Sequence, residues 1–516
     1  MGSSVFQVDE HEYLGEYSNL LSRASVESGE NFAAIASPTF SKQETVTHLY
    51  EYCINSESGL AQKWQTLKYL LQFPLRWCWH GCNLIALSYV YRVRSLPESC
   101  VYLRSWLVPQ SFVDGGIKDE YFRNLANDLG RLENVALSLQ PLGYGLAWRL
   151  RKCELPDSCI IPIGLLSPSD VFKCMFEYLL HARVSLSGSY IFRSREIRTK
   201  INFSLLNDYF GMRSFLAYQE KYIAKKLIDA RIKSFIYVFE NQSWEKAYCH
   251  MFEGSDISIV GYQSSGFSKH CLNFFPNKVD CQMQLQPHFL LTVGEGFKKY
   301  LSEYACYKSK IATFAALRFG HPVINRKYSI NASSSVLYRR LLYAFPVHLT
   351  QYEGIINSLI RLFQNSSIEI HLKFHPITAK RCKNFTNRLP KNFHVVERVD
   401  NSAISELYDA VLFNDNSYGI EALIYGVKCF ELDLFGNSLD ERLIYFDVWQ
   451  CRIDTTGLQN LRDSLEAGSF DKTFDREAVS EYINYLYSPY VGDLSVILKA
   501  INKYGRISKM VNKGVQ

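Results

Sequence analysis

Residues 367–433 read SIEIHLKFHPITAKRCKNFTNRLPKNFHVVERVDNSAISELYDAVLFNDNSYGIEALIYGVKCFELD, and this stretch decides the fold. Apolar residues alternate with polar ones over 368–374, and Pro376 then removes a backbone N–H donor. A strand is therefore predicted that ends on His375. Residues 410–413 are continuously apolar, which is typical of a strand covered on both faces of a sheet.

A helix is predicted directly after this second strand. The apolar run stops at Asn414-Asp-Asn416, and Ser417 then opens a pattern of apolar residues on one helical face, with serine a favourable N-cap. Parallel strands bring His375 and Ser417 to the same edge of the sheet, which is where ligands bind in open α/β sheets. A helix N-terminus at that edge attracts phosphate, so the stretch predicts a phosphate-binding site.

The two motifs, Lys373-Phe-His-Pro376 and Asn416-Ser-Tyr-Gly-Ile-Glu421, resemble the donor half of bacterial surface-polysaccharide glycosyltransferases of the GT-B type. They are most similar to transferases that use CMP-activated ulosonic acids, the Kdo and sialic acid transferases. The resemblance implies that His375 approaches the nucleotide phosphate, that Ser417 and the amides after it hold this phosphate, and that Glu421 bonds the ribose. The nucleotide-binding set that it implies is Lys373, His375, Pro376, Asn416, Ser417, Tyr418, Gly419 and Glu421.

Other functions remain open on the same residues. His-Pro turns also occur in poly(glycerol-phosphate) polymerases and sugar epimerases, and Ser417 would equally serve as a plain N-cap. One alternative is a phosphotransferase using CDP-glycerol or a similar donor. Another is a non-catalytic GT-B-like scaffold that binds glycan or nucleotide, although a scaffold needs no polar groups such as Glu240-Asn-Gln242 and Asn416-Ser417 at several strand ends.

The length of 516 residues exceeds one ordinary domain. Strand and helix patterns alternate along the chain, as in parallel α/β sheets. We expect an α/β, GT-B-like protein with two Rossmann-like domains facing a cleft. The predicted parts are an acceptor-side domain over 1–325, a donor domain over 326–490, and a C-terminal helix over 491–516 that crosses back to the first domain. Residues 320–335 are rich in turn formers and predict the linker between the domains.

Several elements of the first domain are predicted from local patterns. A strand ending in Arg104-Ser105, followed by an Asp119-Glu-Tyr-Phe122 helix, resembles the acceptor half of some surface-carbohydrate transferases. The predicted strands are 33–35, 100–103, 134–139, 235–239, 257–262 and 289–293, and the predicted helices are 43–54, 62–71, 119–129, 169–181, 215–230 and 243–251.

Glu240 is the first candidate for catalysis. It follows the apolar strand 235–239, and Ser243 is expected to cap the next helix. A carboxylate at the end of a central strand belongs at a cleft edge, where desolvation raises its pKa toward a catalytic value. The alternative is that Glu240 caps a helix or pairs with a lysine.

His270 is the second catalytic candidate. Family members often carry a histidine where Ser264 stands, so His270, six residues later, is a substitute acid or base. The alternative is a structural histidine.

The composition excludes some classes of function. The net charge of +6 is mild and no block of Lys or Arg stands out, so nucleic acid is not an expected partner. The expected partners are a nucleotide-sugar donor and a glycan or lipid-linked glycan acceptor. Hydrophobic residues make up 47% and charged residues 21%, while 34 Tyr and 33 Phe suit both a core and stacking on sugars.

No cofactor and no metal are expected. The 14 cysteines are irregularly spaced without a CxxC pair, so they read as reduced thiols, and Cys78, His80 and Cys82 are interpreted as core residues. No DxD motif is present. The nearest approach is Glu431-Leu-Asp433, which lies on a predicted strand and favours solvated or capping groups instead.

The location is expected to be cytoplasmic. The first 15 residues lack the basic and apolar regions of a secretory signal, and no apolar run reaches the ~18 residues of a membrane span. The tail after Asp493 is basic and amphipathic, which favours the crossing helix. Its alternative is an anionic lipid surface, which would place the protein at the cytoplasmic face of the inner membrane.

Overall fold

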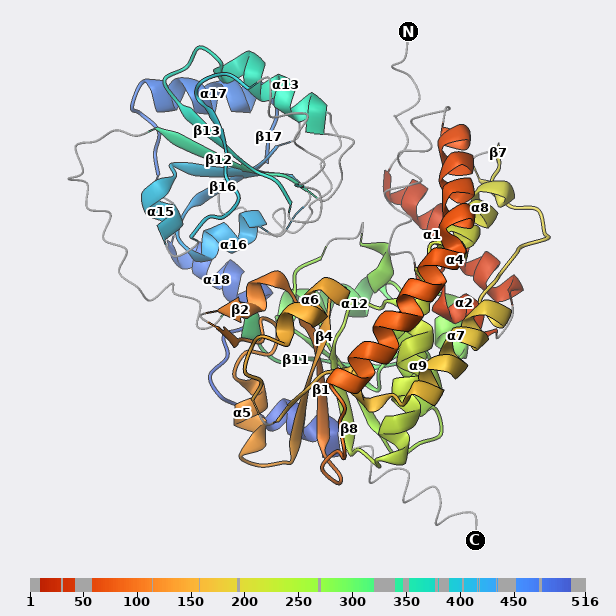
Figure 1. The fold of residues 1–516 in the computed structure, drawn as a ribbon. Coiled ribbons are helices and arrows are strands. Elements are labelled where there is room, and N and C mark those ends of the chain that lie inside the picture. The colour runs from red at the N-terminus through yellow and green to blue at the C-terminus, as the bar shows by residue number, and fades with distance from the viewer. Residues whose placement is uncertain are drawn as a thin grey trace. The chain divides into compact units, whose positions relative to one another are not determined.

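A computed structural model of the chain divides into two compact units (Figure 1). Unit 1 comprises Met1–Ser264, Cys271–Gly320 and Tyr490–Gln516, and unit 2 comprises Ser265–His270 and His321–Pro489. The structure describes residues 10–28, 31–41, 58–113, 115–156, 158–192, 195–267, 271–319, 339–346, 352–375, 379, 389–400, 403–414, 416, 418–432, 434, 452–472 and 476–502.

Unit 1 is built on a seven-stranded sheet in which every pairing is parallel. Its order is β11-β10-β9-β8-β1-β4-β5. The chain adds strands in one direction from β1 to β5 and then returns to the other side of β1 at β8. The strand order therefore reverses between β1 and β8, and ligands of such sheets bind outside this switch point. The strands are β1 (Val101–Leu107), β4 (Val135–Pro141), β5 (Cys159–Ile160), β8 (Ser234–Val238), β9 (Ser258–Tyr262), β10 (Phe289–Thr292) and β11 (Lys310–Thr313).

Helices and two small antiparallel hairpins surround this sheet. The hairpins are β2 (Phe112–Val113) with β3 (Gly116–Ile117), and β6 (Ile191–Phe192) with β7 (Arg195–Glu196). The α-helices are α1 (Glu10–Glu27), α2 (Phe32–Ala36), α4 (Ser58–Val90), α5 (Leu125–Gly130), α6 (Tyr144–Leu150), α7 (Pro168–His181), α8 (Arg198–Phe210), α9 (Phe215–Asp229), α10 (Ser243–Phe252), α11 (Lys278–Gln282) and α12 (Glu295–Tyr304). Short 3-10 turns lie at Pro109–Ser111, Pro162–Leu165, Leu272–Phe274 and Leu317–Phe319.

Unit 2 repeats the same plan with six parallel strands in the order β14-β13-β12-β15-β16-β17. Here the order reverses between β12 and β15, which makes a second switch point. The strands are β12 (Arg340–Ala344), β13 (Glu369–Lys373), β14 (Phe393–Val395), β15 (Ala410–Phe413), β16 (Lys428–Leu432) and β17 (Arg452–Ile453). The helices are α13 (Tyr352–Phe363), α15 (Ile404–Leu407), α16 (Tyr418–Ile424), α17 (Thr455–Glu466) and α18 (Arg476–Leu486).

Both faces of the unit 2 sheet are covered (Figure 1). Helices α13 and α17 contact each other on one face, and α16 contacts α18 on the other. The apolar residues of α13, among them Ile355, Leu359 and Phe363, are buried against the strand residues Ile370 and Leu372. Two units, each with a parallel sheet between helices, confirm the predicted α/β class with two Rossmann-like domains.

The segment 32–36 is a helix, so the predicted strand over 33–35 is wrong. Asn31 accepts a hydrogen bond from the N–H of Ala33 (3.0 Å) and caps helix α2. All of Ala33–Ala36 is buried, partly against α10, and alanine favours helix. A run that is buried on every side carries no periodicity, so the pattern alone could not separate helix from strand.

Two further boundaries differ from the prediction. Strand β1 runs to Leu107, so Arg104 lies inside the strand and not at its end. The predicted helix 119–129 starts only at Leu125, because Asp119 accepts hydrogen bonds from the backbone N–H of Tyr121 (2.9 Å) and forms a turn, and Arg123 adopts a left-handed φ of 53°. The predicted helix 43–54 and the predicted linker 320–335 lie outside the described residues.

The last described segment packs on unit 1. Residues 495–502 are helical, and Ile497, Ala500 and Ile501 are each 1% exposed. Ser258 of β9 donates its hydroxyl to the carbonyl of Ala500 (2.9 Å). No helix in the described part of the chain is both long and apolar enough to cross a membrane.

Candidate functional site

At the switch point of unit 2, Asn416 ties together the ends of two strands and the start of a helix. Its Nδ2 donates to the carbonyls of Ala344, at the end of β12 (3.0 Å), and of Asn414 (2.8 Å). Its Oδ1 accepts from the N–H of Tyr418, the first residue of α16 (2.9 Å). Asn416 therefore binds the first backbone amide of α16. Ser417, the predicted cap, lies outside the described residues.

Gly419 allows α16 to lie directly on the end of β15. A Cβ at this position would stand 2.2 Å from Cδ1 of Phe413, which is closer than any side chain tolerates. The glycine is therefore required for close packing of helix against strand. This brings the first amides of α16 to the edge of the sheet, beside the switch point.

The remaining predicted donor-site residues flank this point. Lys373 ends β13, and its Nζ lies 4.3 Å from the centre of the Tyr418 ring. His375 follows two residues later and is partly exposed, and Glu421 lies within α16 and is 9% exposed. Lys373 and Tyr418 are thus brought together across β12, whereas Pro376 lies outside the described residues.

This arrangement can hold an anion. The ammonium of Lys373 at the end of β13, the imidazole of His375 just beyond it and the backbone amides at the start of α16 are each suited to a phosphate. Burial raises the pKa of Tyr418, with a further contribution from the charge of Glu421. Tyr418 therefore stays a neutral phenol and does not repel a bound phosphate.

At the switch point of unit 1, Glu240 follows β8 and is held by a chain of side-chain hydrogen bonds. Nε2 of Gln242 donates to Oε2 of Glu240. Oε1 of Gln242 in turn accepts from Nε1 of Trp244 (2.9 Å). The Glu240 side chain is partly exposed, so it is reachable from solvent while one of its oxygens is fixed.

A second carboxylate closes the turn after β8. Glu245, which is 1% exposed, accepts from the backbone N–H of Glu240 (3.0 Å) and of Asn241 (2.9 Å). Asn241 has a left-handed φ of 55°, which asparagine tolerates better than most residues. The side chains of Asn241 and Asn273 complete the turn, each donating to a backbone carbonyl (2.7 Å), of Asn273 and of Glu240 respectively.

Helix α10 begins at Ser243 after this turn, and the predicted cap by the Ser243 side chain is wrong. The N-cap position is Gln242, which makes no side-chain capping bond. The Glu245 carboxylate binds the preceding amides instead.

The pKa values of Glu240 and Glu245 are both raised above their ordinary values. Burial raises the pKa of Glu240, while Gln242, Arg104 and Arg318 oppose the shift. Burial and the charge of Glu240 hold the pKa of Glu245 well above its ordinary value, against the backbone N–H groups that bind it. Neighbouring carboxyls that resist ionising together are a common arrangement for proton transfer. Acid or base chemistry at Glu240 is therefore within reach of this site.

A buried ion pair between Arg104 and Glu220 lies next to the side chains that hold Glu240. Arg104 and Glu220 are both 0% exposed, and Nη2 of Arg104 lies 2.7 Å from Oε1 of Glu220. The guanidinium lies 4.3 Å from the ring centre of Trp106 and 3.4 Å from that of Trp244, the residue that binds Gln242. Sequence reasoning missed this pair, because Arg104 was taken for a strand end and Glu220 has no local motif.

Asp208 and Ser264 of unit 1 have surroundings that differ from those of Glu240. Asp208 is 3% exposed and accepts from the hydroxyls of Ser37 and Thr39 (2.6 Å each), so it is a structural link between α8 and the segment after α2. Ser264 is buried at the end of β9, and its hydroxyl has no hydrogen-bond partner among the described residues. His270 lies outside the described residues.

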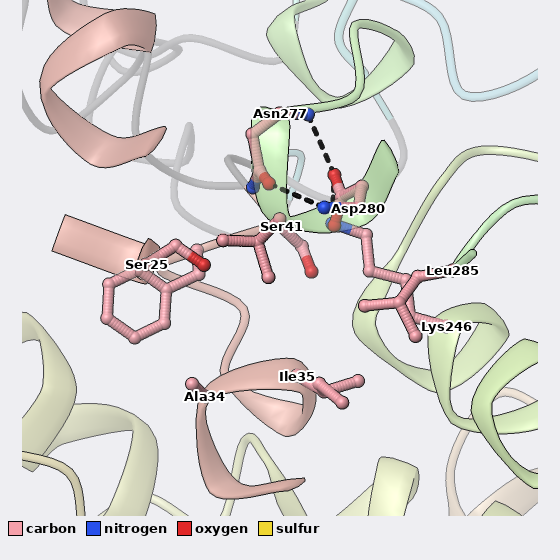
Figure 2. A pocket seen from close by; sticks show the side chains of 10 residues that line it. Ser25, Ala34, Ile35, Ser41, Lys246, Asn277, Asp280 and Leu285 are labelled. Carbon is pink, nitrogen blue, oxygen red and sulfur yellow. Dashed lines mark hydrogen bonds and ion pairs between the residues drawn. The ribbon is translucent and has the colours of Figure 1, made fainter. Parts of the chain in front are cut away.

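A small pocket in unit 1 is built by other elements (Figure 2). Lys246 of α10 and Asp280 of α11 form an ion pair beside it (2.8 Å, side chains 4% and 3% exposed). Asp280 and Asn277 also cap each other at the start of α11. These polar groups satisfy one another, so the pocket is a structural junction between α1, α2, α10 and α11.

The cysteine cluster of α4 is not core, contrary to the prediction. Cys78 and Cys82 are exposed, whereas His80 is held by a hydrogen bond between its Nδ1 and the hydroxyl of Tyr144 (2.8 Å). Burial and Arg76 lower the pKa of His80 to about 4, so it is neutral.

Glu431 is buried in β16 and pairs with Arg452 (3.3 Å). Within the described ranges, no group of three or more His, Cys, Asp and Glu side chains is placed to hold a metal.

No protein-family model matches this chain, and the search of curated proteins found no match. Similar solved structures include the kitacinnamycin glycotransferase (12% identity, 81% of this chain and 99% of that one, TM-score 0.42). Others are UDP-N-acetylglucosamine 2-epimerase from Rickettsia bellii (11%, 81% and 96%, 0.42) and the wall teichoic acid polymerase TagF (10%, 88% and 98%, 0.38). At these identities and TM-scores, no activity of this protein is inferred from the similarity.

Proposed function

We propose that this protein is a glycosyltransferase that moves a sugar from a nucleotide donor to a bacterial surface glycan. The donor is a CMP-activated ulosonic acid such as Kdo. The observation that carries the proposal is the switch point of unit 2, where Lys373 at the end of β13 lies over the ring of Tyr418 at the start of α16. His375 follows two residues after Lys373. Phosphate is the donor group that such a set of amides and cations binds.

In the proposed reaction, unit 2 stabilises the leaving nucleotide. The bond between the sugar and the phosphate oxygen breaks, and the negative charge that develops on the phosphate is met by His375, Lys373 and the first amides of α16. Glu421, in the first turn of the same helix, is proposed to accept hydrogen bonds from the ribose hydroxyls. This part of the reaction needs no metal ligand from the chain.

Unit 1 supplies the proton chemistry. The acceptor hydroxyl that attacks the sugar loses its proton, and Glu240 is proposed to take it as general base. A base works best when its pKa lies near the working pH, and burial shifts that of Glu240 upward in this direction. Gln242 holds one carboxylate oxygen of Glu240 and leaves the other for the proton.

Isothermal titration with CMP, UDP and CDP tests the proposal directly. We expect CMP to bind most tightly, because a CMP-linked donor leaves CMP in the site. A preference for CDP would replace the proposal with a phosphotransferase that uses CDP-glycerol or a similar donor. Absence of binding for all three nucleotides would replace it with a non-catalytic scaffold.

His375→Ala is expected to lower the transfer rate about a hundredfold, as removal of one preorganised donor to a developing charge typically does. The melting temperature should stay close to that of the wild type, because the His375 side chain is partly exposed beyond the end of β13. Initial rates with a CMP-linked donor, measured beside thermal unfolding, provide the check.

His394→Ala is the matched control, since His394 is an exposed histidine on β14 of the same sheet. It should leave both the rate and the melting temperature unchanged. An early-melting His375→Ala variant would instead make His375 a structural residue.

A further inference from the structure

Helix α4 carries large apolar side chains on the face that it exposes. Trp64, Leu67, Leu71, Leu75 and Trp79 follow one another at a spacing of three or four residues, and they are between 42% and 75% exposed. The opposite side of the helix is packed into unit 1 through Thr66, Phe73, Leu84 and Leu87. A surface helix normally keeps polar residues on its exposed side, so the pattern of α4 is unusual.

Helix α7 continues this apolar surface. Phe172, Phe176 and Leu180 are spaced by four residues and are 53%, 52% and 69% exposed. The two helices contact each other (Figure 1). Trp77 of α4 donates its Nε1–H to the carbonyl of Met175 (3.2 Å), and its ring lies 6.1 Å from that of Phe176. We call the five residues of α4 and these three of α7 the α4–α7 face.

The charges around the α4–α7 face are basic. Over its 33 residues α4 contains Lys63, Lys68 and Arg76 but no aspartate or glutamate, and both lysines are exposed beside the apolar stripe. The acids of α7 are neutralised: Asp170 pairs with Lys226 (3.0 Å) and Glu177 pairs with Lys221, both lysines of α9. Apolar surface flanked by lysines is complementary to an anionic surface with an apolar interior.

The positions of two tryptophans indicate which kind of surface the α4–α7 face binds. Trp64 and Trp79 stand near the two ends of the exposed stripe, ~22 Å apart along the helix at ~1.5 Å per residue. Tryptophan prefers the boundary between lipid chains and headgroups, where its ring is in an apolar layer and its N–H stays hydrated. We propose that the α4–α7 face binds the surface of an anionic lipid membrane, with α4 lying in the plane of the headgroups.

The C-terminal tail was the other candidate for contact with lipid. In its described part, the apolar residues Ile497, Ala500 and Ile501 are buried against unit 1 and are not available to a membrane. The α4–α7 face keeps its apolar residues exposed. Its binding to lipid is independent of the proposed transfer reaction, because neither switch point contributes a residue to it.

Co-sedimentation of the full chain with vesicles tests this proposal. We expect binding to vesicles of phosphatidylethanolamine and phosphatidylglycerol and much weaker binding to pure phosphatidylcholine. Leu71→Gln with Leu75→Gln should lower the partition coefficient about a hundredfold, since each leucine loses most of its transfer energy. Lys63→Gln with Lys68→Gln should lower it about fivefold per lysine, and only on anionic vesicles.

Leu132→Gln with Ile191→Gln is the matched control. These two aliphatic residues of unit 1 are each 62% exposed and lie outside the α4–α7 face, so their loss should leave vesicle binding unchanged. Thermal unfolding and light scattering accompany each variant. The proposal is overturned if Leu71→Gln with Leu75→Gln binds vesicles like the wild type, or if the wild type does not bind anionic vesicles. It is also overturned if the wild type is a dimer that this variant dissociates without any change in lipid binding.

Discussion

Glu240→Gln is expected to lower the rate of sugar transfer by about 10²–10⁴-fold, the usual effect of removing a general base. Nucleotide affinity should not change, because the residues proposed to hold the donor belong to unit 2. The amide has the shape of the carboxyl and can still accept from Nε2 of Gln242, so the turn after β8 is retained. Initial rates and nucleotide titration on the same preparation measure both effects.

The pH dependence of the rate separates catalysis from structure. Burial raises the pKa of Glu240, so the base is ionised only above this raised value. The wild-type rate should therefore rise with pH through that pKa, and the variant should lose this step in its profile. A variant with the wild-type rate and profile would show that Glu240 only caps the turn.

The raised pKa of Glu240 also predicts the direction in which Glu240→Gln changes the stability of the protein. A carboxyl whose pKa is higher in the folded state favours folding at low pH, and this contribution is lost as pH rises from its ordinary value through the raised one. Glu240→Gln removes that loss, so its melting temperature at neutral pH should equal or exceed that of the wild type. Glu295→Gln, at an exposed carboxylate in the first turn of α12, is the control that should change neither rate nor pH profile.

Glu220→Ala is expected to destabilise unit 1 by about 3–5 kcal/mol, the cost of leaving one partner of a buried ion pair alone. Arg104 would keep its charge at 0% exposure between Trp106 and Trp244, with no carboxylate to balance it. The hydroxyl of Tyr248 would also lose its acceptor, because it donates to Glu220. Urea unfolding, with hydrogen exchange at the amides of β1 and β8 to assign the transition, measures the effect.

Two further variants make this test specific. Arg104→Met with Glu220→Met removes both charges, so it should recover most of the lost stability, as apolar replacements of buried pairs often do. Lys298→Ala breaks an exposed pair with Glu295 in the same unit and should cost under about 1 kcal/mol. Equal losses for Glu220→Ala and Lys298→Ala would contradict a special role for the buried pair.

The sequence predicted those elements whose burial pattern is local. Residues 410–413 form β15 over the whole predicted run, because a strand covered on both faces is apolar at every position. Helix α9 and strand β8 lie within one residue of their predicted starts for similar reasons. The proposed donor residues around Asn416 and the carboxylate at Glu240 also follow from position, since polar residues directly after apolar strands must reach the carboxyl edge of the sheet.

The sequence could not predict features that depend on contacts between distant residues. The partner of Arg104 is 116 positions away in α9, and nothing near either residue indicates the other. Helix α2 has the composition of a buried segment of either kind, and its cap and its packing on α10 decide the outcome. The exposed stripe of α4 reads as ordinary helical apolar spacing until the structure shows which side faces unit 1.

The sequence by itself determined two α/β units and the strand ends at which polar side chains emerge. Hydrophobic periodicity and turn residues are patterns that extend over only a few positions, so they can be recognised in the amino-acid sequence. Only the tertiary structure decided that these strand ends lie at the switch points between β1 and β8 and between β12 and β15. The order of strands in a sheet depends on which surfaces pack together across the whole chain. The free energy of this packing comes from contacts between distant residues, so no short stretch of the sequence indicates it.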